Sequence, residues 1–123
     1  MTMPPTTNSF LAFLRSFSFA GQGVWGAVRT QRNMRVHLTA AVAAVVAGAV
    51  IGVSPADWAA IALAIGLVLT AEILNTAIES VINLQAPEFH PLAKIAKDAA
   101  AGAVLVASLA AIGVAIAVFA PRL

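Results

Sequence analysis

The sequence predicts an all-α membrane protein, with three transmembrane helices that follow an N-terminal amphipathic surface helix. Hydrophobic residues make up 61% of the 123 positions and charged residues only 10%, whereas about a quarter of the residues in a soluble domain are charged. Segments 38–56 and 99–121 contain no charged side chain. Each is long enough to cross a hydrocarbon core of about 30 Å as a helix. Segment 57–84 is also apolar, apart from two glutamates and a few amides and hydroxyls.

The elements are expected in the following order. Residues 1–7, with two prolines and several threonines, are expected to be a disordered lead-in to a single membrane domain, 8–123. Apolar residues recur at helical spacing over 8–30, which indicates an amphipathic helix that either lies on the membrane surface or packs on the bundle. No cleavable signal peptide is expected, because a basic region and a cleavage site are lacking. The transmembrane helices are expected near 36–53, 57–84 and 98–120.

Basic residues lie on one side of the predicted spans. Those before the first and the third span are Arg29, Arg32, Arg35, Lys94 and Lys97. The connection between the first two spans has none, so the positive-inside rule predicts that the N-terminus and the 85–98 loop are cytoplasmic. The sequence pI near 10.0 rests on few charges and does not indicate a nucleic-acid partner. Small residues, including the pair Gly48 and Gly52, favour close helix packing and self-association.

A polar stripe lies on the second predicted span. At 100° per residue its members fall within about 100° of the helix surface; they are Glu72, Asn75, Thr76, Glu79 and Asn83. An ionisable residue near the bilayer centre costs about 2.5–3.5 kcal/mol on insertion scales, so two glutamates here indicate a function. The alternative is a polar seam that joins helices, although asparagine and threonine would serve that purpose without charge.

A second polar group precedes the third span, where Lys94, Lys97 and Asp98 share one helical face. Lysine can neutralise a phosphate as a point charge. The alternative is that the lysines only set the topology and that Asp98 pairs with Lys94 at i, i+4. Together with the carboxylates of the second span, this group suits a magnesium–nucleotide complex, because Mg²⁺ binds one or two carboxylates plus substrate phosphates.

The segment Gly21–Gly26 matches the dinucleotide pattern GxGxxG. That pattern requires a preceding strand, a following helix and an acidic residue about 20 positions further on. No strand is predicted before it, and alanine and valine surround position 41. We therefore interpret the glycines as a helix face open to a neighbour. The phosphate loop and the protein-kinase motifs are not found in the sequence.

The segments AEILNTAIESVINL and FHPLAKIAKDAAAGAVLV resemble the small bacterial integral-membrane lipid kinases, the prokaryotic diacylglycerol kinase and undecaprenol kinase family. The resemblance extends from about residue 10 to residue 119. Its most specific part is the E-x-x-N-x-x-x-E core with a Lys-Asp pair downstream. The stretches RNMRVHL and HPLAKIAKDAAAGAV are closer to the undecaprenol kinases than to the diacylglycerol kinases.

The resemblance implies a homotrimer in the bacterial inner membrane, with composite active sites at the cytoplasmic surface. The implied reaction is Mg²⁺-dependent transfer of the ATP γ-phosphate to a lipid alcohol, first undecaprenol and second diacylglycerol. By resemblance, Glu72 is the base for the lipid hydroxyl, Asn75 orients the site and Glu79 binds Mg²⁺. The nucleotide contacts that the resemblance implies are Lys97, Asp98, Glu88, His90 and Gly23.

Two positions depart from the family pattern. Gln31 stands where a second metal-binding glutamate is usual, and Asn83 stands where aspartate is common, so each removes one negative charge near the implied metal site. Gln31 keeps open a non-catalytic scaffold descended from a kinase. A transporter or proton-conducting oligomer that uses Glu72 and Glu79 as relay groups is a further alternative, but the uncharged run 58–71 offers no continuation of the path.

Overall fold

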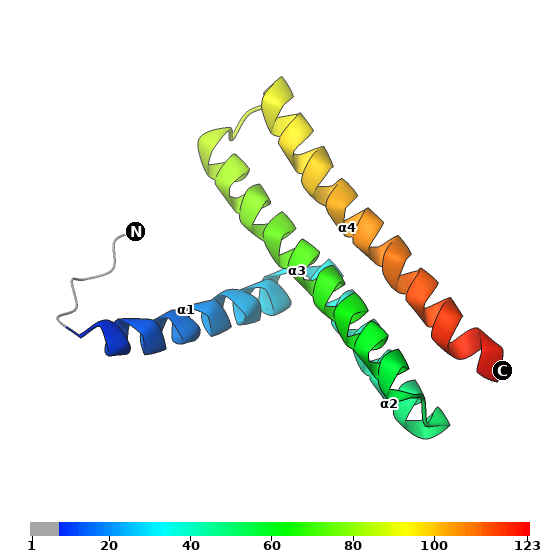
Figure 1. The fold of residues 1–123 in the computed structure, drawn as a ribbon. Helices are drawn as coiled ribbons and strands as arrows, with labels where there is room; N and C mark the ends of the chain where they lie inside the picture. Colours follow the sequence, from blue (N-terminus) through cyan, green and yellow to red (C-terminus); the bar gives the residue numbers. More distant parts are fainter. Residues whose placement is uncertain (1–7) are drawn as a thin grey trace.

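The computed structural model describes residues 8–123 and is helical throughout, with no strand in that part of the chain. The predicted lead-in, 1–7, lies outside the described residues. Figure 1 shows one helix that leaves a bundle of three long ones. The elements are α1 (Ser9–Thr30), α2 (Arg32–Ile51), α3 (Pro55–Gln85), α4 (Pro91–Phe119) and a short 3-10 turn (Ala120–Arg122).

Helices α2, α3 and α4 are each long and apolar enough to cross a membrane, which confirms the predicted fold class. At 1.5 Å per residue, α2 is about 30 Å long and α3 about 46 Å. Helix α3 therefore extends well beyond a hydrocarbon core of about 30 Å. In Figure 1, the end of α3 and the start of α4 continue past the level at which α1 leaves the bundle.

Local sequence fixes where α3 and α4 begin. Ser54 and Asp57 form a reciprocal capping box, and a proline follows directly as the first helical residue. Helix α4 begins at Pro91, earlier than the predicted span near 98, because His90 caps it and proline fits the first helical position. At each start, a side chain of the same segment therefore accepts a backbone N–H group that has no partner within the helix.

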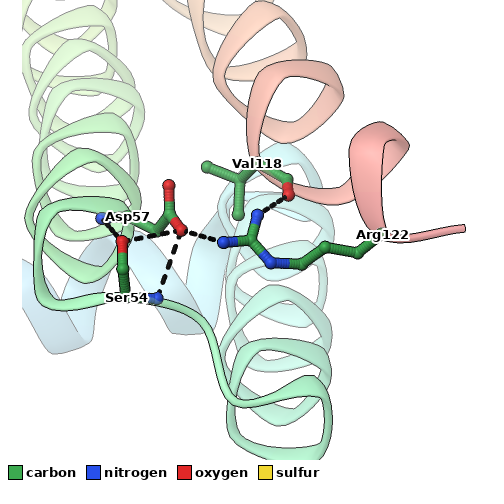
Figure 2. A network of polar contacts seen from close by, with 4 residues as sticks. All are labelled: Ser54, Asp57, Val118 and Arg122. Atoms are coloured by element: carbon green, nitrogen blue, oxygen red, sulfur yellow. Dashed lines mark hydrogen bonds and ion pairs between the residues drawn. The ribbon is translucent and has the colours of Figure 1, made fainter.

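The antiparallel pair α3 and α4 is tied at the end of the bundle shown in Figure 2. The guanidinium of Arg122 donates to Asp57 Oδ2 at 2.5 Å and also donates to the backbone carbonyl of Val118. Because Asp57 belongs to the capping box of α3, this ion pair joins the first turn of α3 to the last residues of the chain. Nearby, Val53, Ile61 and Val118 form a small buried apolar cluster.

Helix α2 packs against α3 at a point where Gly48 of α2 lies close to the ring of Trp58 on α3. A Cβ atom added to Gly48 would lie 2.9 Å from Cη2 of Trp58, so the absence of a side chain lets the indole lie on the α2 backbone. Gly52 adopts a left-handed conformation with φ of 78° and ends α2, as glycine does at a helix C-terminus. Both glycines of the small-residue pattern, Gly48 and Gly52, therefore have a structural role within a single chain.

Helix α1 extends away from the bundle, and α4 lies on the other side of α3 (Figure 1). Only the C-terminal end of α1 packs closely against the bundle, where Ala27 is buried. Its large apolar residues remain exposed; they include Phe10, Phe13, Phe17, Phe19 and Trp25. In a single copy, the helix therefore does not pack along its own bundle, one of the two alternatives that the sequence left open.

We expect Gly48→Ala to destabilise the protein, because the added methyl group overlaps the Trp58 ring and overpacking typically costs about 1–3 kcal/mol. Gly66→Ala is the matched control, since a Cβ there meets no atom within 4 Å and alanine favours a helix. Thermal unfolding of both variants in detergent micelles tests this. Equal unfolding temperatures for the two variants would contradict the packing assigned to Gly48.

Candidate functional site

The polar stripe of α3 is partly buried inside the bundle. Glu72 and Asn75 are the buried polar residues of the described chain, with 1% and 7% of their surface exposed. Glu79 lies two turns beyond Glu72, toward the end of α3, and is half-buried. The stripe thus runs from an enclosed carboxylate to one that water can reach.

Hydrogen bonds along the stripe stay mostly within α3. Asn75 Nδ2 donates to Glu79 Oε1 at 3.3 Å, and Thr76 Oγ1 donates to the backbone carbonyl of Glu72 at 3.0 Å. Two buried side-chain oxygens have no hydrogen-bond partner among residues 8–123, Oε2 of Glu72 and Oδ1 of Asn75. A buried acceptor without a partner lowers the stability of the protein by about 1–3 kcal/mol. A ligand that offers a hydrogen-bond donor or a cation to either oxygen would therefore gain free energy from binding there.

The start of α4 lies against the end of α3. Lys97 Nζ donates to Asn83 Oδ1 at 2.6 Å, a contact between residues 14 positions apart. Lys94 pairs with Asp98 at 2.5 Å on the same helix, as in the alternative that the sequence left open. Asp98 is therefore paired with Lys94 and not with Lys97, and the amide of Asn83 is the group that holds Lys97 in place.

The structure assigns a local role to one of the implied nucleotide contacts. His90 Nδ1 accepts the backbone N–H of Leu92 at 3.1 Å and so caps α4. Glu88 lies exposed in the loop between α3 and α4. Their contacts with a nucleotide stay predictions.

Two further predicted site residues lie near the N-terminal end of the bundle, one between α1 and α2 and one on α1 itself. Gln31 separates the two helices in an extended conformation, and its side chain makes no capping hydrogen bond. Gly23 is exposed on α1, and Figure 1 shows α1 directed away from the start of α4. A single copy therefore does not bring Gly23 together with Lys97, because α1 leaves the bundle on the other side of α3.

One residue of the site was missed in the sequence. His37 of α2 faces the buried carboxylate, with Nε2 3.6 Å from Glu72 Oε2. A histidine inside a predicted membrane span is a signal of function by itself. Its partner could not be identified, because the partner lies on a different helix and the packing of α2 against α3 decides the pairing.

An apolar cavity of about 320 Å³ begins at His37 and lies between α2, α3 and α4. Its walls include Ala44 of α2, Val68 of α3 and Ala111 of α4; apart from His37, Ser108 has the only polar side chain in the lining. A cavity of this composition suits hydrocarbon. Because His37 also faces the carboxylate of Glu72, an apolar chain in this cavity would end near that carboxylate.

Within one copy of the chain, few side chains are placed to bind a metal ion. Among residues 8–123, no group of three or more His, Asp or Glu side chains is arranged to hold a metal ion. Glu79 and the unpartnered Asn75 Oδ1 supply two neighbouring oxygen donors. That fits Mg²⁺, which typically uses one or two carboxylates and completes its coordination with water and substrate phosphates.

Two replacements of His90 separate its capping role from nucleotide binding. His90→Ala is expected to lose the cap of α4 and about 0.5–2 kcal/mol of stability. His90→Asn keeps a good capping side chain but removes the imidazole, so unfolding should remain close to that of the natural protein. Thermal unfolding and KM for ATP are measured for both. A rise in KM for His90→Asn at unchanged stability would show that the imidazole contacts the nucleotide.

Comparison with known proteins identifies the family of the chain. The chain is 42% identical to an undecaprenol kinase of Bacillus subtilis over 116 residues, which cover 94% of each chain. It is 47% identical to a diacylglycerol kinase of Synechocystis over 100 residues, 80% of this chain and 57% of that protein. It is 29% identical to a diacylglycerol kinase of Escherichia coli over 110 residues, 89% of this chain and 90% of the other. Residues 18–119 match the family described as prokaryotic diacylglycerol kinase, and the chain belongs to that family.

Proposed function

We propose that the protein is an ATP-dependent lipid kinase that transfers the γ-phosphate of ATP to undecaprenol. The observation that carries the proposal is the enclosed carboxylate of Glu72, whose Oε2 lacks a hydrogen-bond partner among the described residues and faces His37, which lines an apolar cavity. Undecaprenol is the first choice because the undecaprenol kinase relative is similar over nearly the whole of both chains.

Within this proposal, Glu72 is the general base. Its carboxylate takes the proton of the lipid hydroxyl as the hydroxyl oxygen forms a bond to the γ-phosphorus. The bond between that phosphorus and the oxygen of ADP breaks, so ADP leaves with the electron pair. Phosphoryl transfer requires mainly positioning and charge neutralisation. Lys97, held by Asn83, contributes a positive charge for the phosphates.

Glu79, Asn75 and Gln31 would hold Mg²⁺ together with the nucleotide phosphates. When bound, the ion would neutralise charge on the phosphates. The hydrogen bond from Asn75 Nδ2 to Glu79 Oε1 fixes the carboxylate of Glu79 and leaves Asn75 Oδ1 free to coordinate. Gln31 contributes an amide oxygen in place of a carboxylate and therefore offsets no charge.

The depth of these residues supports a reaction at the membrane surface. Counted from Asp57, about 20 residues of α3 cross a hydrocarbon core of about 30 Å. Glu72 and Asn75 then lie just inside the boundary and Glu79 just outside it. The basic residues that precede α2 and α4 favour the cytoplasm for this end of the bundle, where ATP is available. This location suits a lipid that presents its hydroxyl group at the surface.

The many exposed apolar side chains of the bundle support the implied homotrimer, in which neighbouring copies would cover part of them. Diacylglycerol is the second candidate substrate, because the Synechocystis relative that is 47% identical is a diacylglycerol kinase. A non-catalytic scaffold is the third candidate, and the neutral Gln31 is the observation that favours it.

Transfer of phosphate from labelled ATP, with Mg²⁺ and mixed micelles of undecaprenol or diacylglycerol, tests the proposal. We expect turnover on undecaprenol, and loss of at least about 100-fold in Glu79→Gln, because one charge that holds the metal is removed. Ser80→Ala is the matched control, since Ser80 is exposed and bonds only to the backbone of its own helix. Faster transfer to diacylglycerol than to undecaprenol would make diacylglycerol the substrate. If a folded protein transferred phosphate to neither lipid, the non-catalytic scaffold would be favoured.

Gln31→Glu tests the missing carboxylate separately. We expect the added negative charge to lower the Mg²⁺ concentration required for half-maximal rate several-fold, because a charged ligand attracts the cation more strongly. Gln22→Glu is the control, since it adds the same charge on the exposed part of α1. An equal response of both variants would indicate a general effect of surface charge and would exclude Gln31 as a ligand.

A further inference from the structure

We propose that His37 positions the carboxylate of Glu72 for proton transfer, an inference that rests on the proposed lipid-kinase function. Nε2 of His37 and Oε2 of Glu72 are 3.6 Å apart. The histidine side chain is 20% exposed and the glutamate side chain 1% exposed. The two groups thus meet in an enclosed part of the bundle, where an electrostatic contact is stronger than in water.

The separation of 3.6 Å is longer than a hydrogen bond, so the proposal requires the two side chains to approach each other by a few tenths of an ångström. Catalytic hydrogen bonds are often long in a free enzyme and shorten when the substrate is bound. Of the two oxygens of this carboxylate, Oε2 is the enclosed one without a partner. It is also the oxygen that faces His37, so this contact would satisfy it and leave Oε1 for the lipid hydroxyl.

Two cationic side chains of this region are directed to other acceptors. Arg35, two positions from His37, donates to the carbonyls of Val28 and Arg29 at the end of α1. Lys97 donates to Asn83. Among the lysine, arginine and histidine side chains of the described residues, His37 is the one that lies within 4.0 Å of the Glu72 carboxylate. The neutral ring serves when its proton is on Nε2, and the charged ring serves as well.

Neighbouring hydroxyl groups do not replace this donor. Thr76 Oγ1 is directed to the backbone carbonyl of Glu72 and not to its carboxylate. Thr39, the hydroxyl residue closest to His37 in the sequence, donates to the carbonyl of Arg35. Loss of the imidazole would therefore leave Oε2 without a donor from these side chains.

The position of His37 explains how the carboxylate can be held without being blocked. His37 also lines the apolar cavity between α2, α3 and α4, so it stands between the hydrocarbon-lined space and the buried oxygen. A glutamate side chain has three rotatable bonds, and anchoring one oxygen limits the orientations of the other. The expected benefit is a larger fraction of productive encounters between Glu72 and the hydroxyl, which raises kcat.

The test compares His37→Leu, His37→Asn and His37→Gln with the natural protein in the phosphate-transfer assay. The amide of glutamine can reach Oε2, whereas that of asparagine ends short of it and leucine has no donor. We expect leucine and asparagine to lower kcat about 10–100-fold, with KM for ATP unchanged within about twofold. Glutamine should restore most of the rate. Thr39→Ala is the control, because its hydroxyl bonds only to its own helix.

Each replacement is repeated in a Glu72→Gln background. If His37 acts through the carboxylate, His37→Leu should cause no further loss there, because residues that act as one unit are not additive. A natural rate in His37→Leu would overturn this inference and leave the lipid-kinase function intact. The same holds if His37→Leu lowers the rate equally in both backgrounds, or if glutamine fails as leucine does in a folded protein. Absence of transfer by the natural protein would refute the proposed function and this inference with it.

Discussion

The register of α3 against α4 is the constraint on which the candidate site depends. Asp57–Arg122 at one end and Asn83–Lys97 at the other hold the two helices in one antiparallel alignment. A slip of one residue moves a side chain by about 1.5 Å along the axis and 100° around it, which would remove Lys97 from Asn83. The residue at which each helix begins is set separately, by the N-cap residue and the proline that follows it.

The internal hydrogen bonds of the stripe argue for a ligand over a helix-joining seam. Asn75 bonds to Glu79, and the hydroxyls of Thr76 and Ser80 bond to carbonyls of α3 itself. Of the amides on the stripe, Asn83 is the one that reaches another helix. A proton path is also unsupported within the described chain, since Ser108 is the one polar side chain that lines the cavity beyond His37.

How much the sequence could predict depends on how local each feature is. The three spans and the stripe follow from composition and helical period, and the structure buries Glu72 and Asn75 on the predicted face. The early start of α4 could have been predicted from a histidine that precedes proline, but histidine is a rarer cap than serine. The contacts His37–Glu72 and Asn83–Lys97 join different helices, so they depend on packing distances that the spacing of residues within one helix does not contain.

The local caps on α3 and α4 also bear on the order in which the molecule is built. Each of these helices is capped by a side chain of its own segment, so the start of the helix does not depend on a neighbouring helix. The carboxylate of Glu72 has no such local partner, because the side chain that faces its Oε2 belongs to His37 on α2. Docking of α2 against α3 is therefore the step that brings a polar partner to this buried oxygen, which links the packing of the two helices to the environment of the carboxylate.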